Sequence, residues 1–163
     1  MGQINAEGGC LCGAIRYKID GKILGAAVCH CRDCQYVCGG APSYVFLVTA
    51  QSLEITKGET ASFRSTSDSG AIRIRHFCKA CGTPLFAENS SYPDVLSIKA
   101  GSLDDPSIYK PAAHFWTKSA PNWHYIDPDL PSLPEGESRD PKVPGEASGG
   151  PSGPYPASQP DSS

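Results

Sequence analysis

Three groups of cysteines constrain this chain more than any other feature of its sequence. They are spelled "GGCLCG" (8–13), "CHCRDCQYVC" (29–38) and "FCKACG" (77–82), and they hold all eight cysteines of the 163 residues. Thiols spaced this closely are rarely needed for packing alone. In a reducing compartment they indicate metal binding rather than disulfides. A fold that uses them must bring the distant groups together.

Short apolar segments, rich in β-branched and aromatic residues, lie between and after the cysteine groups. "AIRIRHF" (71–77) alternates apolar and polar residues with a period of two, as a half-buried strand does. Gly, Pro and Asp separate the segments, and no long amphipathic helix is visible. We expect strands over 14–19, 43–48, 52–56, 61–66, 71–77, 95–101 and 112–117, with a short helical turn within 31–40. The sequence therefore predicts a mostly-β domain of short antiparallel strands, with each cysteine group at the start or end of a strand.

Composition changes near residue 127. The segment from there to residue 163 is rich in Pro, Gly and Ser and has no apolar periodicity. Such a segment buries too little apolar surface to offset the conformational entropy of folding. We expect one folded domain over residues 1–126 and a disordered tail over 127–163.

Charge and hydropathy exclude several classes of function. The net charge is −3 and no basic run is present, which argues against a nucleic-acid partner. No window of about 18 apolar residues exists, so no membrane span is expected. The N-terminus lacks the charged and apolar regions of a signal peptide. We expect a soluble cytoplasmic protein, and the sequence does not indicate its oligomeric state.

The first and third cysteine groups match each other in form. In "CKACG", two residues separate Cys78 from Cys81, which lets both thiolates face one tetrahedral ion, and Gly82 permits the tight turn. "CLCG" also ends in glycine. Pairing Cys10 and Cys12 with these two gives four thiolate ligands and no open position. The spacing predicts a structural zinc site that stabilises a domain of modest core.

The middle group offers three ligands from one loop, namely Cys29, Cys31 and Cys34. A catalytic zinc commonly has three protein ligands and leaves the fourth position to water or substrate. A thiol substrate suits that position, because sulfur binds zinc well and a coordinated thiol loses its proton near neutral pH. We expect this loop to be the catalytic centre.

The cysteines of the middle group allow other interpretations. Cys38 could be the fourth ligand and make a second structural site, and His30 could ligate instead. A Cys31–Cys34 redox pair fits poorly because no βαβ pattern surrounds it, and a disulfide framework would need an export signal. A non-catalytic zinc module that binds a protein partner is the main alternative to an enzyme.

The chain resembles the glutathione-dependent formaldehyde-activating enzyme (GFA or CENP-V/GFA) family over roughly residues 8–125. The resemblance is carried by "GGCLCGAIRY", "CHCRDCQ" followed by "GGAP", "FCKACGTPLF" and "FWTKSAPNW". It implies a β-tent (Mss4-like) fold with two zinc ions per chain. By the same resemblance, Cys10, Cys12, Cys78 and Cys81 hold the structural zinc, and Cys29, Cys31 and Cys34 hold the catalytic one.

The resemblance also implies a carbon–sulfur lyase-type activity, in which glutathione or a similar thiol adds reversibly to formaldehyde or a related electrophile. Glutathione carries two carboxylates, so a cation should lie beside the site. Arg32 is the first candidate, followed by Lys99 and Lys118. Trp116 and Trp123 are candidates for the wall of the cleft, and three histidines are candidate proton shuttles: His30, His76 and His114.

Overall fold

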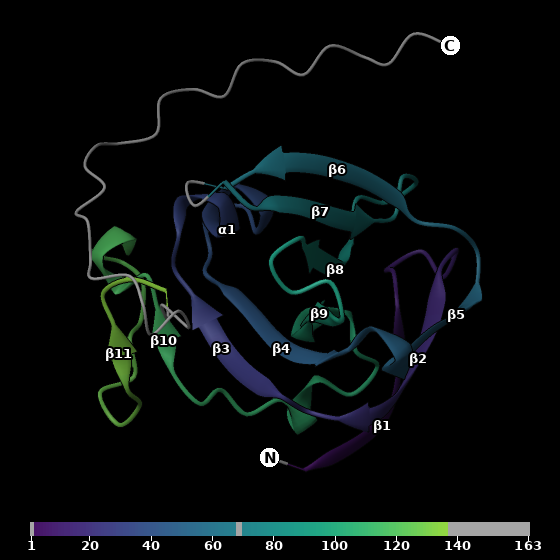
Figure 1. Ribbon diagram of the computed structural model, residues 1–163, viewed down its shortest axis with the longest axis horizontal. Helices are drawn as coiled ribbons and strands as arrows, with labels where there is room; N and C mark the ends of the chain where they lie inside the picture. Colours follow the sequence, from purple (N-terminus) through teal and green to yellow (C-terminus); the bar gives the residue numbers. More distant parts are fainter. Residues whose placement is uncertain (1, 68–69, 137–163) are drawn as a thin grey trace, which may run out of the picture.

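The computed structural model describes residues 2–67 and 70–136. Their strands form two sheets (Figure 1). The small sheet has the order β1-β2-β5, with β1 at Gln3–Gly9, β2 at Arg16–Lys22 and β5 at Leu53–Lys57. The large sheet has the order β11-β10-β3-β4-β9-β8-β7-β6. Its strands are β3 (Gly25–Cys29), β4 (Ser43–Thr49), β6 (Ala61–Thr66), β7 (Ile72–Phe77), β8 (Pro84–Asn89), β9 (Val95–Lys99), β10 (His114–Phe115) and β11 (Ser132–Leu133).

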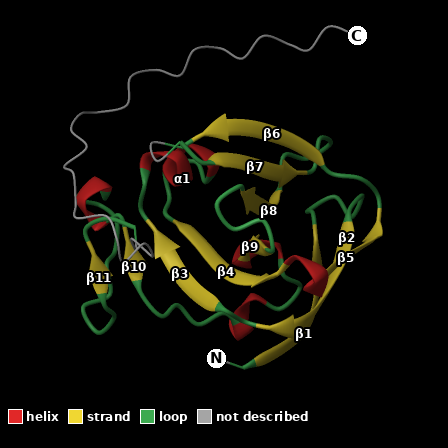
Figure 2. Ribbon diagram, viewed as in Figure 1, coloured by secondary structure: helices red, strands yellow, loops and turns green. Residues whose placement is uncertain are grey.

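Helical structure is confined to short pieces between strands (Figure 2). The α-helix α1 covers Arg32–Val37, inside the segment where a helical turn is expected. The 3-10 turns are η1 (Ala50–Ser52), η2 (Ala100–Ser102), η3 (Pro106–Ile108) and η4 (Thr117–Ser119). None of the helices in the described residues is long and apolar enough to cross a membrane.

The mainly-β class with short antiparallel strands is confirmed. All strand pairs in the described sheets are antiparallel except two, in which β10 pairs in parallel with β3 and with β11. Each predicted strand is present to within a few residues, but β1, β3, β8 and β11 were not expected. β3 reads "GAAVC", and small residues give no β-pattern of their own. Its pairing with the apolar β4 accounts for it.

The large sheet is strongly curved. In Figure 1, β6 and β7 lie on the opposite side of the molecule from β3 and β4, and β8 and β9 connect them behind. Both sheets supply the core, which is fully or almost fully buried and includes Ile4, Tyr17, Ile19, Phe46, Val48, Leu85 and Ile98. Helix α1 follows directly from the end of β3 and lies near β7.

Ordered structure extends past residue 126. Within the region expected to be a tail, β11 pairs with β10 at Ser132 and Leu133. Lys118 forms an ion pair with Glu135, and Gly136 packs against the indole of Trp116. These contacts use single apolar and charged residues without periodicity, so composition could not reveal them. The rest of the expected tail, from residue 137, lies outside the described residues.

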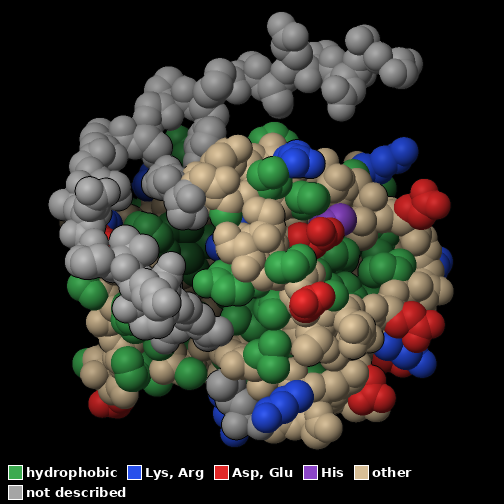
Figure 3. All heavy atoms as spheres, viewed as in Figure 1, with side chains coloured by type: hydrophobic (Ala, Val, Ile, Leu, Met, Phe, Trp, Pro, Cys, Tyr) green, Lys and Arg blue, Asp and Glu red, His purple; other side chains and the backbone are tan. Residues whose placement is uncertain are grey.

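Charged side chains of one sign do not gather into a patch on the face drawn in Figure 3. Lys and Arg alternate there with Asp and Glu among apolar and other side chains. This agrees with the small net charge of −3.

Candidate metal centres

The first and third cysteine groups meet as the sequence predicts. The sulfur atoms of Cys10, Cys12, Cys78 and Cys81 all lie within 4.8 Å of one another. The Cys10–Cys12 sulfur distance is 3.5 Å and the Cys12–Cys78 distance is 3.8 Å. In a tetrahedron with metal–sulfur bonds of about 2.3 Å, sulfur atoms are about 3.8 Å apart. The four side chains therefore fit a tetrahedral ion such as zinc.

Two similar turns form this cluster. The amide of Gly13 donates to the carbonyl of Cys10, and the amide of Gly82 donates to that of Cys78. Both glycines have positive φ, 71° and 76°, which a side chain would disfavour. The amide of Leu11 donates to Thr83 Oγ1 and joins the two turns.

Thr83 also acts on the cluster's charge. Its hydroxyl lies 3.2 Å from Cys81 Sγ. Hydrogen bonding from Thr83 lowers the pKa of Cys81 to about 5, so this thiol is prepared as a thiolate ligand.

The second cluster forms where β3 ends and α1 begins. The sulfur atoms of Cys29, Cys31 and Cys34 lie within 4.8 Å of one another. Cys31 is the N-cap of α1, and its sulfur accepts from the amide of Cys34 at 3.5 Å. Hydrogen bonding between Cys29 and Cys31 lowers the pKa of the Cys31 thiol and raises that of the Cys29 thiol. A metal ion in place of the thiol protons would satisfy all three sulfurs.

Cys38 does not join this group in the described part of the chain. The compact set has three members, and Cys38 Sγ lies 4.0 Å from the ammonium of Lys99 instead. Lys99 also donates to Ser43 Oγ. Hydrogen bonding to Cys29 lowers the pKa of Cys34, but hydrogen bonding to Cys31 and burial raise it, and the result is a pKa of about 12. The charge of Lys99 has a smaller lowering effect.

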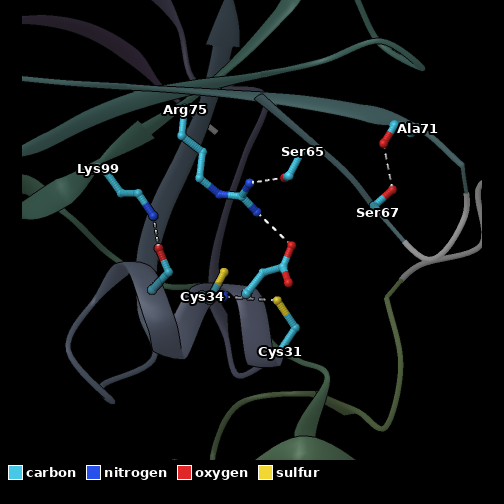
Figure 4. Close-up of polar contacts among 9 residues, drawn as sticks. Cys31, Cys34, Ser65, Ser67, Ala71, Arg75 and Lys99 are labelled. Carbon is cyan, nitrogen blue, oxygen red and sulfur yellow. Dashed lines mark hydrogen bonds and ion pairs between the residues drawn. The ribbon is translucent and has the colours of Figure 1, made fainter. Parts of the chain in front are cut away.

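Arg75 is a second cation beside the cluster. From β7 it donates to Asp33 at 2.8 Å and to Ser65 at 2.6 Å, and only 18% of its side chain is exposed. Figure 4 shows Arg75 reaching from the sheet toward the start of α1, near Cys34 and Cys31, whereas Lys99 approaches the other side of the helix, where it donates to Ser43. The alternation of "AIRIRHF" puts Arg75 on a solvated strand face. In the structure Arg75 instead pairs with Asp33 at the start of α1 and is mostly buried.

A cavity of about 140 Å³ adjoins these cations. Its lining includes Val37 of α1, the aromatic rings of β6, β7 and β8, and the turn at Gly82: Val37, Phe63, Arg75, His76, Phe77, Gly82, Pro84, Phe86 and Lys99. Val37 belongs to the helix that carries Cys34, and Gly82 directly follows Cys81. A larger apolar cavity of about 240 Å³ is lined by other residues, and no cysteine of either cluster lines either cavity.

The other candidate cations, Arg32 and Lys118, have partners outside the cysteine clusters. Arg32 is exposed, donates to Gln35 Oε1 and has its guanidinium 4.9 Å from the centre of the Tyr36 ring. Lys118 pairs with Glu135 and lies over Trp116. Trp123 is 66% exposed and packs its edge against His124.

Three histidines are linked behind the second cluster. His30 Nε2 lies 2.9 Å from His114 Nδ1, and His30 Nδ1 lies 2.9 Å from His124 Nδ1. Burial, with the nearby imidazoles, lowers the pKa of His30 to about 4, so the ring is neutral at pH 7. The sequence singled out His30 and His114 but not His124, which stands in no cysteine motif. The fourth histidine, His76, instead lies between Thr60 and Glu88.

Comparisons with known proteins relate the chain to one family. The family model described as glutathione-dependent formaldehyde-activating enzyme matches residues 5–119. A Halomonas elongata protein named "Putative glutathione-dependent formaldehyde-activating enzyme" is 25% identical over 126 residues, which are 74% of this chain and 80% of that protein. An uncharacterized lyase of Schizosaccharomyces pombe is 38% identical over 80 residues, 49% of this chain and 55% of that protein. A crystal structure of a Rhodobacter sphaeroides protein has the same fold, with a TM-score of 0.51, 15% identity and coverage of 78% of this chain and 98% of that one.

The fold and its clusters define a mainly-β protein that can hold metal ions on cysteine ligands. More particularly, because the family model covers most of the described residues, the chain belongs to the glutathione-dependent formaldehyde-activating enzyme family. The resemblance seen in the sequence is confirmed.

Proposed function

We propose that the protein is a zinc-dependent carbon–sulfur lyase that adds glutathione, or a similar thiol, reversibly to formaldehyde or a related electrophile. The family and the names of both relatives support an enzyme of this type. In this proposal each chain holds two zinc ions. Cys10, Cys12, Cys78 and Cys81 hold the structural ion, and Cys29, Cys31 and Cys34 hold the catalytic one.

One observation carries the proposal. The second cluster has three compactly placed sulfurs, and Cys38 faces Lys99 rather than completing the set. A zinc ion bound there would lower the pKa of an incoming thiol and hold it as a thiolate. This favours an enzyme over a non-catalytic module, for which a closed site would be expected.

The chain's own groups would bind and orient the substrate. The thiolate sulfur forms a bond to the aldehyde carbon, the carbon–oxygen π bond breaks, and the thiol proton ends on the new hydroxyl through solvent. Lys99 and Arg75, which both line the 140 Å³ cavity, would attract the carboxylates of glutathione. The rings of Phe63, Phe77 and Phe86 would limit the access of water. Arg32 would contribute only if its guanidinium left Tyr36.

The reaction can be followed directly by exchange spectroscopy. With ¹³C-formaldehyde and glutathione at equilibrium, the protein should accelerate exchange between formaldehyde hydrate and S-hydroxymethylglutathione. Cys29→Ser should abolish the acceleration, and Lys99→Gln should weaken saturation by glutathione more than it changes the maximal rate. Wild-type protein with both metals bound but no acceleration would overturn the reaction proposed here.

A further inference from the structure

The chain of three histidines has defined ends. At one end the backbone amide of Asp127 donates to His114 Nε2 at 3.1 Å. At the other end His124 Nε2 lies 2.8 Å from the carbonyl oxygen of Gly40. An amide can only donate and a carbonyl can only accept. These two groups therefore fix the direction of every hydrogen bond between them.

The direction follows ring by ring. Because His114 accepts at Nε2, its proton is on Nδ1 and is donated to His30 Nε2. His30 then carries its proton on Nδ1 and donates to His124 Nδ1. His124 carries its proton on Nε2 and donates to Gly40. Each ring holds one proton and is neutral, and every ring nitrogen has a partner.

His30 lies between two cysteines of the second cluster and is fully buried. Its amide donates to the carbonyl of Phe115, and its carbonyl accepts from Gln35 Nε2 at 2.7 Å. Neighbouring side chains of an extended backbone point to opposite sides. When the His30 ring is held on one side of this backbone, the side chains of Cys29 and Cys31 both point to the other side, where Cys34 lies.

We propose that His30, His114 and His124 are positioning residues: a one-directional chain of neutral imidazoles that fixes residues 29–31 as a preformed metal-binding loop. The chain also ties that loop to the Gly40 turn and to the segment that begins at β10. Its effect on the loop rests on the proposed function, which places a metal there. The direction of the hydrogen bonds is independent of the proposed function.

Long-range ¹H–¹⁵N correlation spectra of the histidine rings test the direction in the wild-type protein. We expect Nδ1–H forms for His30 and His114 and an Nε2–H form for His124 near neutral pH. An Nε2–H proton on His30 or His114, or two protons on either ring, would overturn the proposal. This measurement needs no variant and no activity.

Substitutions at His114 test the effect on the loop. His114→Leu keeps most of the side-chain volume but removes the hydrogen-bond donor to His30. In this variant, a chelator should remove metal about 10-fold faster from one of the two sites, the second cluster. His114→Asn leaves a cavity but keeps an amide donor near the Nδ1 position, so it should stay within about twofold of wild type. If both variants lost metal equally, packing alone would explain the result and the proposal would fail.

A matched control separates positioning from general destabilisation. Tyr17→Phe removes the buried 2.7 Å hydrogen bond between Tyr17 in β2 and Ser102 in η2, so it should lower the melting temperature without faster metal release. Release that tracked melting temperature in all variants would refute the positioning role. A wild-type protein with metal only on the Cys10 cluster would instead contradict the proposed function, and the ring tautomers would still decide the direction of the chain.

Discussion

At the residue scale, replacing one cysteine should affect folding differently in the two clusters. A structural zinc contributes on the order of 10 kcal/mol to folding, comparable with the whole stability of a small domain. Cys81→Ser should therefore leave the domain largely unfolded by circular dichroism. Cys29→Ser should keep the fold and lose one zinc, because its loop holds α1 by other bonds as well. Identical behaviour of the two variants would contradict the division into structural and catalytic sites.

Cys38 provides a second prediction at this scale. Because it faces Lys99, Cys38→Ser should keep two zinc ions per chain and the formaldehyde exchange activity within about twofold. Metal analysis and the exchange assay check this. Loss of one zinc in Cys38→Ser would mean that its thiol is a fourth ligand.

Residues within motifs could be predicted from the sequence, whereas those that the fold brings to them could not. Spacing alone placed seven cysteines in two sets, and the structure assembles both sets. Arg75 and His124 stand in no metal-ligand motif. Arg75 reaches the site through its ion pair with Asp33 of α1, and His124 through its contact with His30, which is 94 positions away in the sequence. Such long-range placement leaves no local pattern.

At the element scale, the turn between β5 and β6 should be unusually sensitive to substitution. Gly58 has a φ of 73°, and a Cβ there would lie 2.2 Å from the carbonyl oxygen of Ala14, beside the first cysteine turn. Gly70 has a φ of 80° with open space around it. Gly70→Ala should cost about 1 kcal/mol, and Gly58→Ala more than about 3 kcal/mol because the backbone must also shift. Urea denaturation of both variants checks this, and equal costs would refute the close contact.

Strands with a clear apolar pattern could be predicted from the sequence, and strands without one could not. β7 and β4 carry alternating or continuous apolar residues, and both were predicted to within a residue of their ends. β3 and β11 consist of small or few residues and exist because a neighbouring strand pairs with them. Their formation depends on partners far away in the chain, which local propensity does not encode.

At the scale of the whole molecule, the folded unit should extend past residue 126 to include β11, Glu135 and Gly136. A chain cut after residue 136 keeps β11, Glu135 and Gly136 with their contacts, so its melting temperature should equal that of the full chain. A chain cut after residue 126 loses them and should melt roughly 5–10 °C lower. Differential scanning calorimetry of both truncations distinguishes the two boundaries. Equal melting after the shorter cut would restore the boundary expected from composition.

In the proposed function, the second cysteine cluster holds a zinc ion with one position open to a thiol. Native mass spectrometry of the reduced protein, with and without glutathione, is the decisive measurement, because it counts bound metal and retained thiol together. We expect two zinc ions per chain and one glutathione adduct that disappears in Cys29→Ser. Two zinc ions without an adduct, or a single zinc ion, would contradict the proposed function.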